Sequence, residues 1–225
     1  MGLGKPLTLR NDYPMSAVKL ARVLVVDDDP FIRTALEGAL SSSGFEVVAT
    51  SNAREALSIL NGTGIEIALL DLDLGIGPTG IDLAYALRKL NEKIGIIFLT
   101  TYLDPRFADV RNKSLPQGSR YLVKSEIENI ANVISVILQT KHRPYNHNVN
   151  HINKFSGLTD LQIEIWKSVT EGISSAEIAE QRGISEKAVE ATLARIYQFL
   201  GIRKEKSNNP RILLVNAFKA MSGKH

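Results

Sequence analysis

Polar side chains suited to holding a phosphoryl group follow four short apolar segments in the first 125 residues. Each segment has the aliphatic composition of a buried strand. The polar residues at their ends are Asp27, Asp28, Asp71, Thr100 and Lys124. Because all strands of a parallel α/β sheet end at one edge, where ligands bind, we expect three carboxylates, a hydroxyl and an ammonium to converge there.

This set of groups favours phosphoryl transfer assisted by a hard metal ion. Clustered carboxylates repel one another unless a cation neutralises them, and aspartate oxygens favour Mg²⁺. A carboxylate such as Asp71 can act as a nucleophile and form an aspartyl phosphate. Lys124 and the metal would stabilise the charge on the phosphoryl oxygens, and Thr100 would donate a hydrogen bond to one of them.

Residues 21–139 alternate between strand and helix patterns. The strands are expected at 22–26, 46–49, 67–70, 96–99 and 121–123, and the helices at 30–44, 52–60, 80–90, 105–113 and 126–138. Asp29 and Pro30 have the residue types of a helix cap and a first helical position. This alternation predicts a doubly wound, five-stranded parallel sheet with right-handed crossovers.

The last 70 residues have only helical patterns and predict a second, smaller all-α domain. Thr159 with Gln162, and Ser174 with Glu177, match the capping box, and Ser185 can cap a third helix. Gly172 and Gly183 stand where the first two helices should end. Short helices joined by such turns are typical of a helix-turn-helix. A fourth helix is expected at 212–221.

The expected domain organisation is a tail at 1–15, an α/β domain at 16–139, a linker at 140–155 and a helical domain at 156–225. The linker is polar and aperiodic, and it carries three of the four histidines. A metal cluster there would need further ligands, and no carboxylate or cysteine lies nearby. A solvated linker is therefore the favoured interpretation over a metal site.

The charge of the chain is unevenly divided. Residues 16–138 carry 12 Lys/Arg against 15 Asp/Glu, whereas residues 139–225 carry 13 against 8. The excess of basic residues suggests that the second half meets a polyanion. The chain has no cysteine, no apolar run of roughly 18 residues that could span a bilayer, and no apolar segment typical of a signal peptide. We therefore expect a cytoplasmic protein that does not use a membrane.

Residues 21–138 resemble the receiver domain of two-component response regulators. The matching motifs are VVDDDP at 25–30, LLDLDL at 69–74, LTT at 99–101 and YLVK at 121–124, in the family's order and at its intervals. The resemblance implies that Asp71 is the phospho-acceptor and that Mg²⁺ is held by Asp27, Asp28, Asp71 and the backbone carbonyl of Asp73. It also implies that Thr100 is the switch hydroxyl, Tyr121 the switch aromatic residue and Lys124 the phosphate-binding lysine.

Two features depart from the receiver pattern. The loop at 75–80 is expected to be longer and more flexible than the family's short loop, which would alter access for the kinase or the lifetime of the phosphate. Ser125 replaces a proline that many receivers carry after the lysine. Neither change removes a chemical group from the expected site.

The helical region resembles the LuxR/FixJ/NarL type of DNA-binding domain. The resemblance covers about 158–202 and rests on LT at 158–159, TEG at 170–172, SAEIA at 175–179 and GISEKAVE at 183–190. It implies that the third helix lies in the major groove. The residues on its outer face are expected to include Lys187, Glu190, Ala191, Ala194 and Arg195. Trp166 and Tyr197 are expected in the core or an interface.

The outer face of that helix is unusual for the family. Lys187 and Arg195 would contact phosphates, although a solvated helix face is the simpler reading of both. Glu190 stands where relatives commonly carry a basic residue, and Ala191 and Ala194 offer apolar contact only. A carboxylate can accept from cytosine N4 and an alanine can touch a thymine methyl group, so a weak or unusual operator preference is expected.

Together these features predict a DNA-binding transcriptional response regulator and not an enzyme. The expected partners are a sensor histidine kinase that phosphorylates Asp71, double-stranded DNA, and a second copy of the chain that pairs on phosphorylation. An alternative is a receiver-containing interaction module whose helix-turn-helix binds DNA weakly or not at all. A stand-alone aspartyl-phosphate hydrolase is disfavoured, because no second acid/base is placed beside Asp71 and Asp73 alternates away from it.

Overall fold

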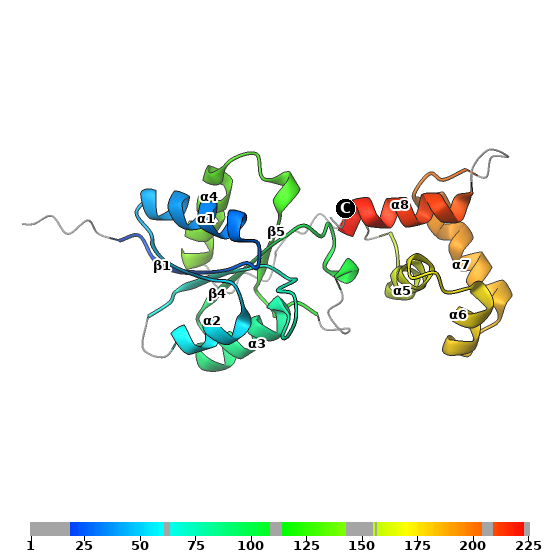
Figure 1. Ribbon diagram of the computed structural model, residues 1–225, viewed down its shortest axis with the longest axis horizontal. Coiled ribbons are helices and arrows are strands. Elements are labelled where there is room, and N and C mark those ends of the chain that lie inside the picture. Colours follow the sequence, from blue (N-terminus) through cyan, green and yellow to red (C-terminus); the bar gives the residue numbers. More distant parts are fainter. Residues whose placement is uncertain are drawn as a thin grey trace, which may run out of the picture.

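The computed structural model describes residues 19–60, 64–108, 114–142, 155, 157–203 and 209–222. It contains an α/β part followed by a helical part (Figure 1). The expected tail at 1–15 and His147 and His151 of the expected linker lie outside the described residues. Within those residues, no helix combines the length and the apolar character that a bilayer span requires.

The α/β part is a five-stranded, fully parallel sheet with the order β2-β1-β3-β4-β5. The strands are β1 (Arg22–Val26), β2 (Glu46–Thr50), β3 (Ile67–Leu70), β4 (Gly95–Thr100) and β5 (Arg120–Val123). The sequence-based fold class is therefore confirmed for this part. Every strand runs in the same direction, so the five carboxyl ends meet at a single edge.

Helices cover both faces of the sheet. They are α1 (Pro30–Ser42), α2 (Ala53–Ile59), α3 (Gly80–Leu90) and α4 (Ile130–His142), with α1 and α4 on one face and α2 and α3 on the other (Figure 1). The central strands β1, β3 and β4 are almost entirely buried. Runs of apolar residues in these strands are what a sheet covered on both faces requires.

Three details of the α/β part differ from the sequence-based expectation. A 3₁₀ turn, η2 (Lys124–Glu126), follows β5, so that α4 begins at Ile130 and not at residue 126. The Asn129 side chain accepts a hydrogen bond from the Asn132 amide at the start of this helix. The helix expected at 105–113 is a short 3₁₀ helix, η1 (Pro105–Phe107), over its described residues. β4 is longer by one residue at each end.

The helical part contains α5 (Asp160–Thr170), α6 (Ser175–Arg182), α7 (Glu186–Phe199) and α8 (Pro210–Ser222). The predicted capping box of Thr159 and Gln162 is present, and Ser174 and Ser185 cap the next two helices through their hydroxyls. Gly183 adopts a left-handed conformation with φ 63°, which lets the chain turn from α6 into α7. The predicted helix-turn-helix and the all-helical second part are confirmed.

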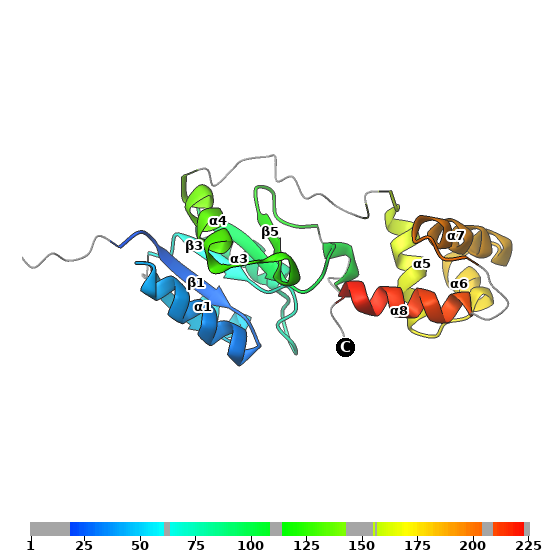
Figure 2. The ribbon, with the colours of Figure 1, turned by 90° about the horizontal axis from the view of Figure 1, so that it is seen from above.

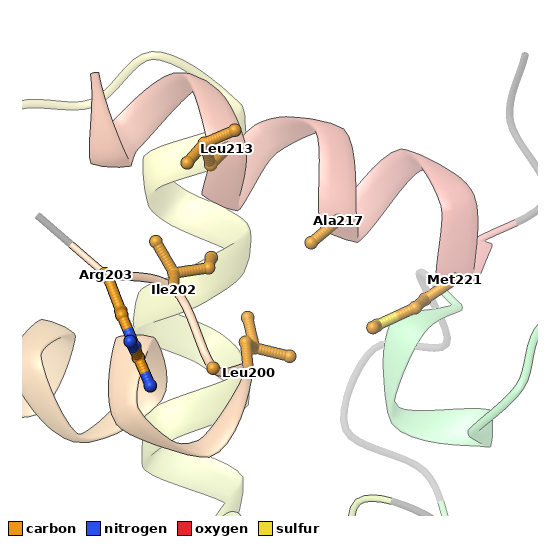
Figure 3. Close-up of a pocket in the computed structure, with 7 residues that line it drawn as sticks. Leu200, Ile202, Arg203, Leu213, Ala217 and Met221 are labelled. Atoms are coloured by element: carbon orange, nitrogen blue, oxygen red, sulfur yellow. The ribbon is translucent and has the colours of Figure 1, made fainter. Parts of the chain in front are cut away.

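The core of the helical part forms around Trp166, which is fully buried and donates from Nε1 to the carbonyl oxygen of Leu214 at 3.0 Å. Tyr197 is also buried, as expected. A pocket opens on the side of this core between the end of α7 and α8 (Figure 3). Its lining is mostly apolar and comprises Leu200, Gly201, Ile202, Arg203, Leu213, Ala217 and Met221.

Candidate functional site

The carboxyl edge of the sheet brings the predicted site residues together. Asp27 follows β1 and Asp71 follows β3, and these strands are neighbours, so the two carboxylates lie side by side. Carboxylate oxygens of Asp27, Asp28 and Asp71 all lie within 4.8 Å of one another. Asp27 and Asp71 are buried, whereas Asp28 is exposed. This spacing suits three oxygen ligands around one hard cation.

Lys124 closes the site from the other end of the sheet. Its Nζ lies 2.7 Å from Oδ2 of Asp27 and 2.6 Å from Oδ2 of Asp71, and its side chain is only 12% exposed. The lysine is therefore the neutralising charge for both buried carboxylates. Burial raises the pKa of Asp27 and of Asp71, while the hydrogen bonds and charge of Lys124 act in the opposite direction.

Local backbone contacts fix the acidic loops. The Asp29 amide donates to Oδ1 of Asp27 at 3.1 Å, and the Asp29 carboxylate caps α1 by accepting from the amide of Phe31 at 2.8 Å. Arg33, one turn into α1, donates to the backbone oxygen of Asp27 at 2.7 Å. These bonds fix the loop after β1, from which the Asp28 carboxylate joins those of Asp27 and Asp71.

The loop after β3 passes very close to the start of α3. The Gly80 amide donates to the carbonyl oxygen of Leu72 at 3.0 Å, and a Cβ on Gly80 would lie 1.8 Å from the carbonyl oxygen of Asp71. Only a glycine fits at this point. The sequence-based interpretation of the 75–80 loop as unusually flexible misses this constraint, which anchors the end of the loop to the acceptor residue.

The two residues predicted to act as switches lie at the same edge. Thr100 ends β4 and is fully buried, and Tyr121 on β5 is buried as well. Tyr121 donates from its hydroxyl to the carbonyl oxygen of Tyr102 at 2.8 Å. Tyr102, which the sequence did not single out, also donates from its hydroxyl to Oδ2 of Asp73 at 3.2 Å. It joins the β3 and β4 ends of the site.

The residues predicted to meet DNA lie together on the outer face of α7. Lys187, Glu190, Ala191, Ala194 and Arg195 are all exposed, while Val189, Leu193, Ile196 and Tyr197 are buried. Glu190 differs from the rest, because its Oε1 accepts a hydrogen bond from the hydroxyl of Ser175 at the start of α6.

Comparisons with protein families match both parts of the chain. Residues 23–134 match the response regulator receiver domain, and residues 156–206 match the bacterial regulatory proteins of the luxR family. The chain is a response regulator. It combines a receiver domain with a LuxR-family helix-turn-helix domain, and it therefore belongs to a group of DNA-binding transcriptional regulators of two-component systems that are not enzymes.

Individual relatives agree with this assignment along most of the chain. The Fimbriae Z protein of Salmonella typhimurium is 25% identical over 82% of this response regulator and 92% of its own length. The nitrate/nitrite response regulator protein NarP of Escherichia coli is 27% identical over 81% and 89%. A structure of two RcsB dimers bound to two parallel DNAs matches 89% of this chain and 98% of its own, with 18% identity and a TM-score of 0.57.

Proposed function

We propose that this response regulator is switched by phosphorylation of Asp71 and then binds DNA as a dimer. The observation that carries the proposal is the cluster of Asp27, Asp28 and Asp71, in which the ammonium of Lys124 is paired with Asp27 and Asp71. A sensor histidine kinase is the proposed donor, since receiver domains belong to two-component systems. An oxygen of the Asp71 carboxylate attacks the phosphorus, and the bond from phosphorus to the kinase's imidazole nitrogen breaks.

Each neighbouring residue has a defined task in this transfer. Asp27, Asp28 and Asp71, with the backbone carbonyl of Asp73, would hold Mg²⁺, which supplies positive charge for the phosphoryl oxygens. The ammonium of Lys124 already bonds to Asp71 and can move onto a phosphoryl oxygen while it stays beside Asp27. The buried hydroxyl of Thr100 can then donate to another of these oxygens, and Tyr121 is the aromatic residue that follows the movement of this edge.

The proposed DNA surface is the outer face of α7. Lys187 and Arg195 would contact phosphates, whereas Glu190, Ala191 and Ala194 would face the bases. The RcsB structure supports a dimeric complex, because RcsB dimers are bound to DNA there. DNA as the target also supports the expected cytoplasmic location. For the domain boundaries we propose a receiver at 16–139, a linker at 140–155 and a DNA-binding domain at 156–225.

Labelling with a small-molecule donor tests the acceptor. Purified full-length protein is incubated with acetyl phosphate and Mg²⁺, and the phosphorylated form is separated on a phosphate-affinity gel. The wild type is expected to be labelled and Asp71→Asn to stay unlabelled. Asp29→Asn is the matched control, because asparagine keeps the helix cap and the residue lies outside the metal cluster. Equal labelling of Asp71→Asn and wild type would disprove the assignment of the acceptor.

The salt dependence of duplex binding distinguishes the proposed function from the alternative, an interaction module that does not bind DNA. Phosphate contacts release counterions, so the affinity for a fluorescent duplex should fall steeply as salt rises. Binding that is absent at low salt, or that does not respond to salt, would favour the interaction module.

A further inference from the structure

The segment Tyr102–Ala108, here called the docking segment, connects the receiver to the DNA-binding domain in space. It follows β4 directly and ends in the short helix η1. The Leu103 amide donates to the carbonyl oxygen of Met221 at 3.1 Å, near the end of α8. Figure 3 shows Met221 on α8 beside this part of the receiver.

Arg106 forms the polar half of the contact. Its guanidinium bonds to the carboxylate of Asp104 at 2.8 to 3.1 Å, and to the backbone oxygens of Phe155 at 2.8 Å and Leu158 at 2.7 Å. It also reaches Oδ1 of Asp160 at 3.1 Å. The Asp104 side chain is completely buried. A planar guanidinium can bind a carboxylate and several backbone oxygens at once. One receiver side chain therefore binds the backbone that leads into α5.

Phe107 forms the apolar half. Its ring packs edge-on against Phe155, Trp166 and Phe218, with centroid distances of 4.8, 5.3 and 5.3 Å. Trp166 and Phe218 belong to the helical part, Phe155 is the last residue of the expected linker, and Phe107 itself is 3% exposed. Aromatic rings attract one another in this geometry. Lys167 on α5 adds a hydrogen bond from Nζ to the carbonyl oxygen of Ala108 at 2.9 Å.

The first residue of the docking segment is bound to the acceptor site. The Tyr102 hydroxyl donates to Asp73, two residues beyond Asp71, and the Tyr102 carbonyl oxygen accepts from Tyr121. Tyr102 is 3% exposed and cannot shift without disturbing its neighbours. A continuous set of contacts therefore connects the loop after Asp71, through Tyr102, to the residues of the docking segment that contact α5 and α8.

The contact leaves the DNA-binding surface open. The docking segment meets α5 and α8, whereas α6 and α7 lie at the end of the molecule farthest from the sheet (Figures 1 and 2). A contact that inhibits by masking the DNA-binding surface would have to cover α7. We propose instead that the docking segment is a coupling element, through which the state of Asp71 sets the position of the DNA-binding domain while α7 stays free. This inference rests on the proposed phosphorylation of Asp71.

Trp166 makes the proposal testable, because it is the only tryptophan of the chain and contacts Phe107. Full-length protein is mixed with Mg²⁺ and BeF₃⁻, which mimics the phosphoryl group, and Trp166 emission is recorded. A change is expected in wild type and should be lost in Arg106→Lys, which keeps a cation beside Asp104 but cannot bridge the backbone oxygens. Arg120→Lys is the matched control, since Arg120 bonds within the receiver, to Oε1 of Gln139 at 3.2 Å, and should respond like wild type.

Tyr102→Phe tests the other end of the coupling. It removes only the hydroxyl that bonds Asp73, so labelling of Asp71 by acetyl phosphate should persist while the Trp166 response is lost. Hydrogen exchange of the resting proteins measures the docking itself. Peptides that cover the docking segment and the start of α5 should exchange faster in Arg106→Lys than in Arg120→Lys, even if Asp71 accepts no phosphate.

Three results would overturn the coupling. The first is an unchanged Trp166 response in Arg106→Lys, and the second is no response in a wild type that is fully labelled at Asp71. The third is full DNA binding by Arg106→Lys without BeF₃⁻, which would make the contact inhibitory. Failure of labelling in wild type would instead count against the proposed function, while the exchange data would still decide whether the two domains are docked.

Discussion

Gly80 offers the sharpest test of the site geometry. A methyl group on this residue would have to retreat by about 1.2 Å, from 1.8 Å to the 3.0 Å that real Cβ atoms keep from the Asp71 carbonyl oxygen. That oxygen is backbone at the end of a fully buried strand, so it cannot turn aside. Overpacking of this kind costs about 1–3 kcal/mol, and we expect Gly80→Ala to reach the upper end of that range.

Gly38 provides the matched control, because it lies within α1 and an added Cβ would meet nothing within 4 Å. Alanine in a helix interior is more favourable than glycine by about 0.5–1 kcal/mol. The same chemical change should therefore destabilise the protein at residue 80 and stabilise it at residue 38. Urea unfolding followed by far-UV circular dichroism measures both, with the midpoints compared at an unchanged slope.

Phosphorylation gives the second arm of this test. Gly80→Ala should lower the rate of acetyl phosphate labelling, since the acceptor loop must move away from α3, whereas Gly38→Ala should leave that rate unchanged. If Gly80→Ala unfolds at the wild-type urea concentration and is labelled at the wild-type rate, the close approach of α3 to Asp71 does not exist in solution.

Four further predictions concern charge. Folding raises the pKa of the Asp71 carboxyl above 3.8, its usual value. Wild type should therefore lose stability as the pH rises above 3.8, because the buried carboxyl must then ionise. Asp71→Asn has no such group and should gain stability relative to wild type between pH 4 and 7 in urea unfolding. Glu46 has a pKa lowered to about 2, chiefly by its hydrogen bond to Arg22, so Glu46→Gln should lose stability above pH 4.5 but not near pH 2. Mg²⁺ at 100 times its dissociation constant should stabilise wild type by about 2.7 kcal/mol in thermal unfolding and Asp28→Ala much less. Lys187→Ala should reduce the salt slope of DNA binding by about 1, whereas Lys219→Ala on α8 should leave it unchanged.

Most of the receiver site could be predicted because its residues are tied to strand ends. Once the parallel sheet is inferred, Asp27, Asp71, Thr100 and Lys124 must share an edge, whatever their separation in sequence. The starts of helices were predictable where a side chain caps them, as Asp29 does for α1. The start of α4 was missed, because the 3₁₀ turn after Lys124 uses residues with an ordinary helical pattern.

The docking segment could not be predicted in the same way. Arg106 and Phe107 stand at the start of the helix expected at 105–113. The partners of this segment in the helical part are about 50 to 120 residues away in sequence. The one local signal is Asp104 before Pro105, which indicates a helix start. It gives no hint that the Asp104 carboxylate is buried or that Arg106 bonds to a second domain.

Glu190 shows how the structure changes the meaning of a sequence departure. An acidic residue on a DNA-binding helix should repel phosphates, but its carboxylate accepts from the Ser175 hydroxyl, which in turn accepts from Nη2 of Arg211 at 3.0 Å. Burial raises the pKa of the Tyr197 hydroxyl, the charge of Arg211 lowers it, and the charge of Glu190 raises it further.

The carboxylate of Glu190 is thereby oriented toward the start of α6, where a helix favours negative charge. The Ser175 hydroxyl bonds both to this carboxylate on α7 and to the guanidinium of Arg211 on α8, so the three side chains join α6, α7 and α8. Repulsion between Glu190 and the DNA backbone is then reduced. On this reasoning Glu190→Lys, which resembles the family's usual residue, would break the Ser175 bond and loosen α7 instead of simply strengthening DNA binding.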